Sequence, residues 1–209
     1  MLLLDAPLTF HEYMTHEDVP LASVFREVLT YLRSRDDAVL FGAQAVNAYC
    51  EPPRMTADVD VLSTCARGLA DDLRDHLGAR FHVAIRVREV VAGVGFRVYQ
   101  IRRPKNRHLV DIRQTESLPT AQRIEGVQVA MPLELVAMKV VAIAARSGRE
   151  KELSDRLDVV RLLRTFPELK TRDGSVRTRL GELRATADAF VVWDGLVNQS
   201  IAPDEDDGY

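Results

Sequence analysis

The sequence contains few cysteines and no hydrophobic run of membrane-spanning length. Two cysteines, Cys50 and Cys65, make neither a disulfide framework nor a recognisable metal motif, so we expect both to be ordinary small apolar residues. The N-terminal MLLLDAPL has no basic leader and is interrupted by Asp5. These absences exclude a disulfide-rich secreted scaffold, and they favour a cytoplasmic protein with no membrane partner.

The chain also lacks an excess of charge of one sign. Its 28 lysines and arginines against 31 acidic residues give a net charge of -3, which provides no global attraction to nucleic acid. Binding of RNA would therefore need a local basic patch. RRPKNRH, residues 102–108, offers four cations and a histidine, and it is either a solvated loop or a contact to an RNA backbone.

What the sequence does contain is a pattern of early strands and late helices. Strands are predicted over 38–42, 57–63, 81–91, 96–103 and 108–114, with a hairpin turn at AGVG, residues 92–95. Helices are predicted over 21–34, from 43 to about 50, over 66–77 with Gly78 as C-cap, and twice between 133 and 164. A further helical pattern over 176–198 contains Trp193, which we expect to be packed.

This order predicts an α+β fold, with a mixed sheet flanked by helices and a helical C-terminal part. At 209 residues the chain is long enough for one domain with a helical appendage. We expect a core domain over 1–131, a helical part over 132–200 and a mobile acidic tail over 201–209.

Two aspartates interrupt the strand pattern of TADVDVLS, residues 56–63. Asp58 and Asp60 would project from the same side of a strand, because side chains at positions i and i+2 share a face. Two carboxylates held ~5 Å apart repel by roughly 3 kcal/mol at an effective dielectric constant of about 20, a cost that a divalent cation removes. The alternative is that both lie in solvent at the open end of the strand, near Arg54.

The neighbouring residues favour a phosphate-associated metal. Gly42 stands where a strand turns into a helix, so that free backbone N–H groups could face a phosphate. Asp111, in HLVDIRQ, is a third acid in an apolar strand. Mg²⁺ bound by carboxylates usually takes its remaining ligands from waters and substrate phosphates.

Three stretches together resemble a known fold: FGAQAVNAYCEPPRMTADVDVLS, then VDI, then LVAMKVVAIAARSGREKELSDRLDVVRLL. They look like the nucleotidyltransferase fold of the DNA polymerase β superfamily, and within it the AbiEii-like group found in toxin-antitoxin pairs. The resemblance covers roughly residues 38–164. It implies that Gly42 and Ala43 bind nucleotide phosphates, and that Asp58, Asp60 and Asp111 bind Mg²⁺, with Mn²⁺ as a substitute. Ala43 departs from the family, in which serine or a second glycine is common.

The resemblance also implies nucleotide-binding roles in the C-terminal helices. Lys139 and Asp155 match the lysine and aspartate of the AbiEii-like group, and Asp158 completes an Asp-x-x-Asp pattern. Lys139 lies in an almost wholly apolar helix, where a buried ammonium needs a partner, and Arg146 two turns later could share an anionic ligand with it. The alternative is an ion pair that ties Lys139 to Asp155 or Asp158.

The second of these helices could also carry its acids in solvent. Asp155 and Asp158 lie near one another on the helix, while Leu153, Leu157 and Val160 form an apolar stripe. A solvated acidic face is therefore the simple alternative to a nucleotide-binding role for the two aspartates.

We therefore expect a Mg²⁺-dependent nucleotidyltransferase that transfers a nucleoside monophosphate from a nucleoside triphosphate to an acceptor hydroxyl. The family suggests RNA or tRNA as acceptor and an antitoxin protein as partner. The alternative is a non-catalytic module that keeps the fold and binds a nucleotide or a protein.

Overall fold

A computed structural model describes residues 19–200 of the chain. These residues belong to two compact units, the first ending at Met131 and the second beginning at Pro132. The acidic tail predicted for 201–209 lies outside the described residues. No helix in the described part of the chain is long and apolar enough to cross a membrane.

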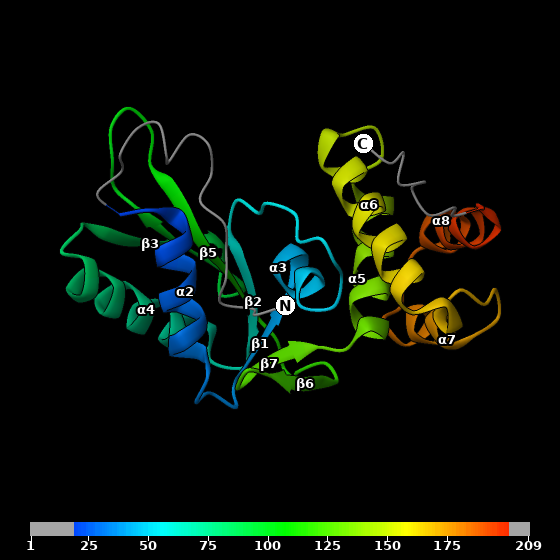
Figure 1. Cartoon of the computed structure of the whole chain (residues 1–209), viewed down its shortest axis with the longest axis horizontal. Coiled ribbons are helices and arrows are strands. Elements are labelled where there is room, and N and C mark those ends of the chain that lie inside the picture. Colours follow the sequence, from blue (N-terminus) through cyan, green and yellow to red (C-terminus); the bar gives the residue numbers. More distant parts are fainter. Residues whose placement is uncertain (1–18, 201–209) are drawn as a thin grey trace, which may run out of the picture. The chain divides into compact units, whose positions relative to one another are not determined.

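A seven-stranded mixed sheet with the order β3-β4-β5-β2-β1-β7-β6 forms the first unit (Figure 1). β1 is antiparallel to β2 and parallel to β7, and β2 is parallel to β5, while β3, β4 and β5 follow one another as antiparallel neighbours. The predicted mixed sheet with flanking helices is confirmed. The strands are β1 (Ala38–Phe41), β2 (Val59–Ser63), β3 (Ile85–Val91), β4 (Gly95–Gln100), β5 (Arg107–Gln114), β6 (Ala121–Ile124) and β7 (Val127–Ala130).

In the described part of the first unit, three helices contact this sheet, and the two sets of alternating side chains of β2 differ in burial. Helices α2 (Leu21–Leu32) and α4 (Ala66–Phe81) contact each other and the sheet, whereas α3 (Gly42–Asn47) contacts β1 and β2 (Figure 1). In β2, the buried Val59, Val61 and Ser63 alternate with the half-buried Asp60 and Leu62. Because alternate residues of a strand point to opposite faces, Asp60 lies on the face away from the buried valines.

Gly78 does not end α4 as the sequence predicted. The helix continues to Phe81, and His82 follows with a φ of 53°, the left-handed conformation of a helix C-cap. Gly78 is not among the glycines with positive φ. The helix takes up Phe81 of the predicted strand 81–91 and its C-cap takes up His82, and β3 begins only at Ile85.

The β6–β7 hairpin was not predicted. Its turn, Glu125 and Gly126, has φ values of 50° and 86°. Positive φ at both central residues is the geometry of a type I′ hairpin turn, whose usual sequence is Asn-Gly or Asp-Gly. Because glutamate stands at the first of these two positions, the sequence did not indicate a hairpin turn here.

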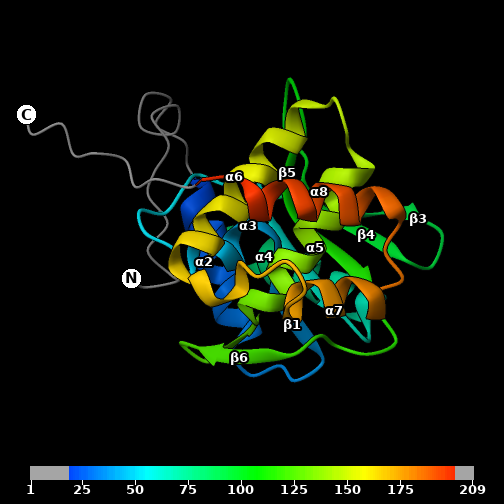
Figure 2. The same ribbon diagram turned by 90° about the vertical axis from the view of Figure 1, so that its right-hand side faces the viewer.

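Within residues 132–200, four helices and a short 3₁₀ turn make up the second unit, and Figure 2 shows the helices. α5 contacts each of the other three helices, and its residues Leu135, Val136, Val140 and Ile143 are buried, which confirms the helix predicted to be apolar on nearly all sides. Trp193 is fully buried, as predicted, and its indole N–H donates to a backbone carbonyl. The elements are α5 (Pro132–Ala145), α6 (Glu150–Thr165), η1 (Pro167–Leu169), α7 (Ser175–Glu182) and α8 (Ala187–Asn198).

Candidate metal and nucleotide site

The two aspartates of TADVDVLS take different backbone positions. Asp58 lies in a bend directly before β2, while Asp60 is the second residue of that strand. Both side chains are partly buried. The strand thus begins at Val59, two residues later than the predicted strand over 57–63, and only Asp60 of the two aspartates belongs to it.

Asp111 lies beside Asp60 in the sheet. The parallel pairing of β2 with β5 places Asp60 opposite Asp111 and Val59 opposite Val110. Residues paired in this way project from the same face of the sheet. The third acid predicted from HLVDIRQ therefore shares a face with Asp60 of β2.

A β-bulge brings a histidine to the same face. Val98 of β4 pairs with Val110, but Tyr99 pairs with His108, so that Leu109 is an extra residue in β5. Regular alternation would place His108 with Val110, on the face away from Asp111. The bulge shifts the alternation by one residue and re-aims the imidazole toward the aspartates.

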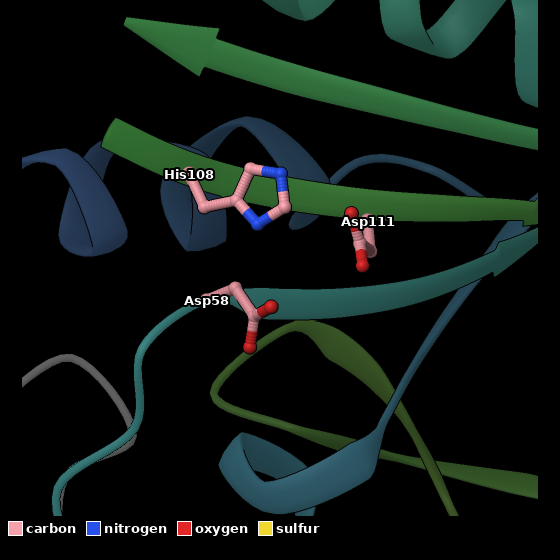
Figure 3. Close-up of side chains that lie close together, drawn as sticks. All are labelled: Asp58, His108 and Asp111. Atoms are coloured by element: carbon pink, nitrogen blue, oxygen red, sulfur yellow. The ribbon is translucent and has the colours of Figure 1, made fainter. Parts of the chain in front are cut away.

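Asp58, His108 and Asp111 converge (Figure 3). One potential ligand atom of each residue lies within 4.8 Å of those of the other two, and all three side chains are partly buried. Adjacent ligands of an octahedral cation with bonds of about 2.1 Å lie about 3.0 Å apart and opposite ligands about 4.2 Å apart, so the three ligand atoms must move closer together to hold one cation. In chemical type, two carboxylates and an imidazole fit a divalent cation.

Arg97 of β4 is a further member of this site. Its Nε and Nη2 donate to the two carboxylate oxygens of Asp111 at 2.7 and 3.0 Å, a bidentate ion pair. These hydrogen bonds raise the pKa of Arg97 above its usual value, and the charges of Asp58 and Asp60 raise it further. The cluster therefore contains a cation that lies near all three predicted metal-binding acids.

Gly42 is required by its contact with Asp60. The glycine has a φ of 70°, and a Cβ atom built on it would lie 2.1 Å from Oδ2 of Asp60. Both the left-handed backbone and the close approach exclude a side chain at this position. The turn from β1 into α3 thus lies directly against the Asp60 carboxylate, and the half-buried Ala43 follows it without the hydroxyl that serine would supply.

The predicted nucleotide-binding residues of the second unit form a buried ion-pair cluster. Nζ of Lys139 lies 2.7 Å from Oδ1 of Asp155 and 2.7 Å from Oδ2 of Asp158, and Arg146 pairs with the other oxygen of Asp155. Asp155 is 2% exposed and Asp158 fully buried. The ion-pair alternative describes this geometry, and a contact with nucleotide remains a prediction for these four residues.

Helix α6 exposes two of the three residues that were predicted to form its apolar stripe. Leu153 is 68% exposed and Leu157 51%, Val160 is half-buried, and Asp155 and Asp158 are buried. The alternative of a solvated acidic face is therefore wrong. Lys139 and Arg146 supply the reason, because they neutralise the carboxylates that α6 buries.

Sequence reasoning missed Arg97 and His108. The sequence could have indicated Arg97, because it stands between the apolar Phe96 and Val98 and the alternation predicts that its side chain lies on the polar face of the strand. His108 had no such signal, because its orientation depends on a bulge that no residue type marks.

Comparisons with known proteins identify the fold. A scan against protein-family models and a search of curated proteins give no match. Among solved structures, the Megavirus polyadenylate synthase is similar with a TM-score of 0.58 and 12% identity, over 70% of this chain and 32% of that chain. JHP933 from Helicobacter pylori is similar with a TM-score of 0.52 and 13% identity, over 91% of this chain and 94% of that chain.

At such identities the likeness concerns the fold alone. The expected nucleotidyltransferase-like fold, a mixed sheet flanked by helices, is confirmed. The chain spans less than a third of the length of the polyadenylate synthase, so that much of that protein has no counterpart in it.

Proposed function

We propose that the protein is a divalent-metal-dependent nucleotidyltransferase. It would transfer a nucleoside monophosphate from a nucleoside triphosphate to an acceptor hydroxyl and release pyrophosphate. The observation that carries this proposal is the convergence of Asp58, in the bend before β2, and Asp111, in the neighbouring β5, on the face where Asp60 lies against Gly42. The shared fold of a polyadenylate synthase supports it.

The carboxylates of Asp58, Asp60 and Asp111 would hold the metal, Mg²⁺ or Mn²⁺ in its place. Carboxylate oxygens are the protein ligands that Mg²⁺ prefers where the remaining ligands are substrate phosphates. A bound divalent cation neutralises phosphate oxygens and favours ionisation of the attacking hydroxyl. Asp111 would hold a second cation or accept the proton of that hydroxyl.

Arg97 and Gly42 would position and stabilise the triphosphate. The acceptor oxygen forms a bond to the α-phosphorus while the bond to the pyrophosphate oxygen breaks, and negative charge builds on the phosphate oxygens. A guanidinium is well suited to bind such oxygens in pairs. Gly42, which has no side chain, lets the backbone approach the phosphates closely.

The subgroup, acceptor and partner follow from the resemblance. We propose an AbiEii-like enzyme of a toxin-antitoxin pair in the cytoplasm, with RNA or tRNA as acceptor and an antitoxin protein as partner. The exposed Arg103 and Lys105, between β4 and β5, could contact an RNA backbone. By the resemblance Lys139 would contact the triphosphate, and Arg146, from its place two turns later on the chain, would share that anionic ligand, which requires part of their ion-pair cluster to open.

Transfer of label from an α-labelled triphosphate tests the proposal. With Mg²⁺ and each of the four triphosphates, label should pass to RNA, and an Asp60→Asn variant should lose at least about a hundred-fold in rate. Asp75→Asn, an exposed acid on α4 that pairs with Arg74, is the matched control and should keep the parent rate. An Asp60→Asn variant as active as the parent would refute the metal role.

The alternative, a non-catalytic module, has one observation in its favour. Both oxygens of Asp111 already accept hydrogen bonds from Arg97, as in a structural ion pair. Isothermal titration separates the two functions: an enzyme binds triphosphate only with metal and with Asp58 intact, whereas an interaction module binds its partner without either.

A further inference from the structure

We propose that His108 is a direct metal ligand and that it makes this site select Mn²⁺ over Mg²⁺. The inference rests on the metal site of the proposed function and extends it to the identity of the cation. It assigns a role to a residue that does not belong to the three predicted acids.

The first argument is the placement of the imidazole. His108 reaches the Asp58–Asp111 face only because Leu109 is an extra residue in β5. Bulges interrupt the hydrogen bonding of a sheet and are over-represented next to active sites, where they re-aim a side chain. Figure 3 shows the result: the ring of His108 and the carboxylates of Asp58 and Asp111 are directed toward one another.

The second argument is the chemistry of the ligand set. Mg²⁺ is bound through oxygen, whereas imidazole nitrogen suits first-row transition metals. Mn²⁺ accepts carboxylate oxygen as Mg²⁺ does, and although it is the weakest binder of the first-row transition series, it gains more from a nitrogen ligand than Mg²⁺ does. An imidazole added to the carboxylates therefore favours Mn²⁺ over Mg²⁺.

The third argument is charge. Arg97 places a positive charge on Asp111 and near Asp58 and Asp60, which weakens the attraction of the cluster for any cation. An imidazole contributes a metal bond that does not depend on net charge. A cation that gains from this bond is favoured over one that depends on carboxylate charge alone.

Electron paramagnetic resonance with Mn²⁺ tests the proposal on the full chain without nucleotide. Free Mn²⁺ gives a sharp spectrum that is lost on binding, so a titration yields the affinity, and competition with Mg²⁺ yields the selectivity. Electron spin-echo envelope modulation then reports a directly bound histidine nitrogen. We expect nitrogen modulation in the parent protein and Mn²⁺ binding at least about ten-fold tighter than Mg²⁺ binding.

His108→Ala is the decisive variant. It should lower the Mn²⁺ affinity at least about ten-fold and abolish the nitrogen modulation, while the Mg²⁺ affinity stays within about two-fold. His82→Asn is the matched control, because His82 lies at the end of α4 with a left-handed backbone that asparagine tolerates. It should bind both metals as the parent does.

Two results would overturn the role of His108: bound Mn²⁺ without nitrogen modulation in the parent protein, or an unchanged Mn²⁺ affinity in His108→Ala. The first needs no variant, so it does not depend on whether His108→Ala folds. If nitrogen modulation is absent while label transfer still requires Asp60, only this inference fails. If it is present while no triphosphate is ever used, the Mn²⁺ site stands and the proposed transferase function fails.

Discussion

The carboxylates of the two units differ in their burial and in their ion-pair partners. In the helical unit, Asp155 and Asp158 are almost fully buried, and Lys139 lies 2.7 Å from an oxygen of each. On the sheet, Asp58 and Asp111 remain partly exposed. Within residues 19–200, the Asp111 carboxylate has Arg97 as its ion-pair partner, and the structure shows no ion pair or side-chain hydrogen bond for the Asp58 carboxylate.

The difference separates charge that maintains a fold from charge that is suited to binding. Buried acids are stable only when cations and hydrogen bonds compensate them, so the helical cluster depends on its own members. The sheet acids keep contact with water and face a histidine that can also ligate a metal. Removing one charge from the helical cluster should therefore lower the unfolding free energy, whereas removing one from the sheet acids should leave it unchanged or raise it.

The largest expected effect comes from Lys139→Met. The substitution leaves Asp158 without its lysine and Asp155 with Arg146 alone, and breaking a buried ion pair by removing one partner costs about 3–5 kcal/mol of unfolding free energy. Urea unfolding followed by circular dichroism measures this. Asp58→Asn is the counterpart on the sheet, and it should leave the unfolding free energy unchanged or raise it. Equal losses in the two variants would erase the distinction between the units.

Gly42→Ala should have the next largest effect. An alanine in the left-handed region costs about 1–2 kcal/mol, and its Cβ would collide with the carboxylate of Asp60, so we expect a total loss above 2 kcal/mol and loss of transfer activity. Gly93→Ala is the matched control, because Gly93 has a φ of 68° and a Cβ atom added to it would meet nothing within 4 Å. It should show the backbone cost alone.

A double variant tests the collision itself. If Asp60 is the obstacle, then Gly42→Ala combined with Asp60→Gly should be less destabilised than the sum of the single changes, because glycine removes the Cβ atom at 2.8 Å as well as the carboxylate. Additive effects would show that the turn tolerates a methyl group, and that Gly42 is needed only for its backbone conformation.

These residues also show what the sequence could and could not predict. Asp58, Asp60, Asp111 and Gly42 were singled out from charge in predicted apolar strands and from a turn residue, because such features are locally costly and require an explanation. Their roles in binding a metal or a nucleotide stay predictions. The residues of α6 alone could not predict that Asp155 is buried. The cations that neutralise it are Lys139, on α5, and Arg146, just after the end of α5. His108 depends on a strand register that only the folded sheet defines.

Arg97→Gln should have opposite effects on metal binding and on catalysis. Loss of a positive charge beside three acids should raise the Mn²⁺ or Mg²⁺ affinity by at least about three-fold. Transfer activity should nevertheless fall by about ten-fold, because Arg97 no longer neutralises the phosphates. Arg88→Gln is the control, because Arg88 of β3 lies opposite Arg97 of β4 in the sheet but its side chain is exposed. A fall in both quantities would mean that Arg97 only maintains the strand geometry.

The smallest expected effect concerns the exposed leucines of α6, and it tests the orientation of that helix. Leu157→Ser should change the unfolding free energy by less than about 0.5 kcal/mol, because Leu157 is half exposed and its loss leaves no cavity. Leu162→Ala, five residues later and fully buried, should cost about 2–5 kcal/mol. If Leu157→Ser costs as much as Leu162→Ala, then α6 packs by its predicted apolar stripe. Asp155 and Asp158 would then lie in solvent, and the contrast between the two groups of carboxylates would disappear.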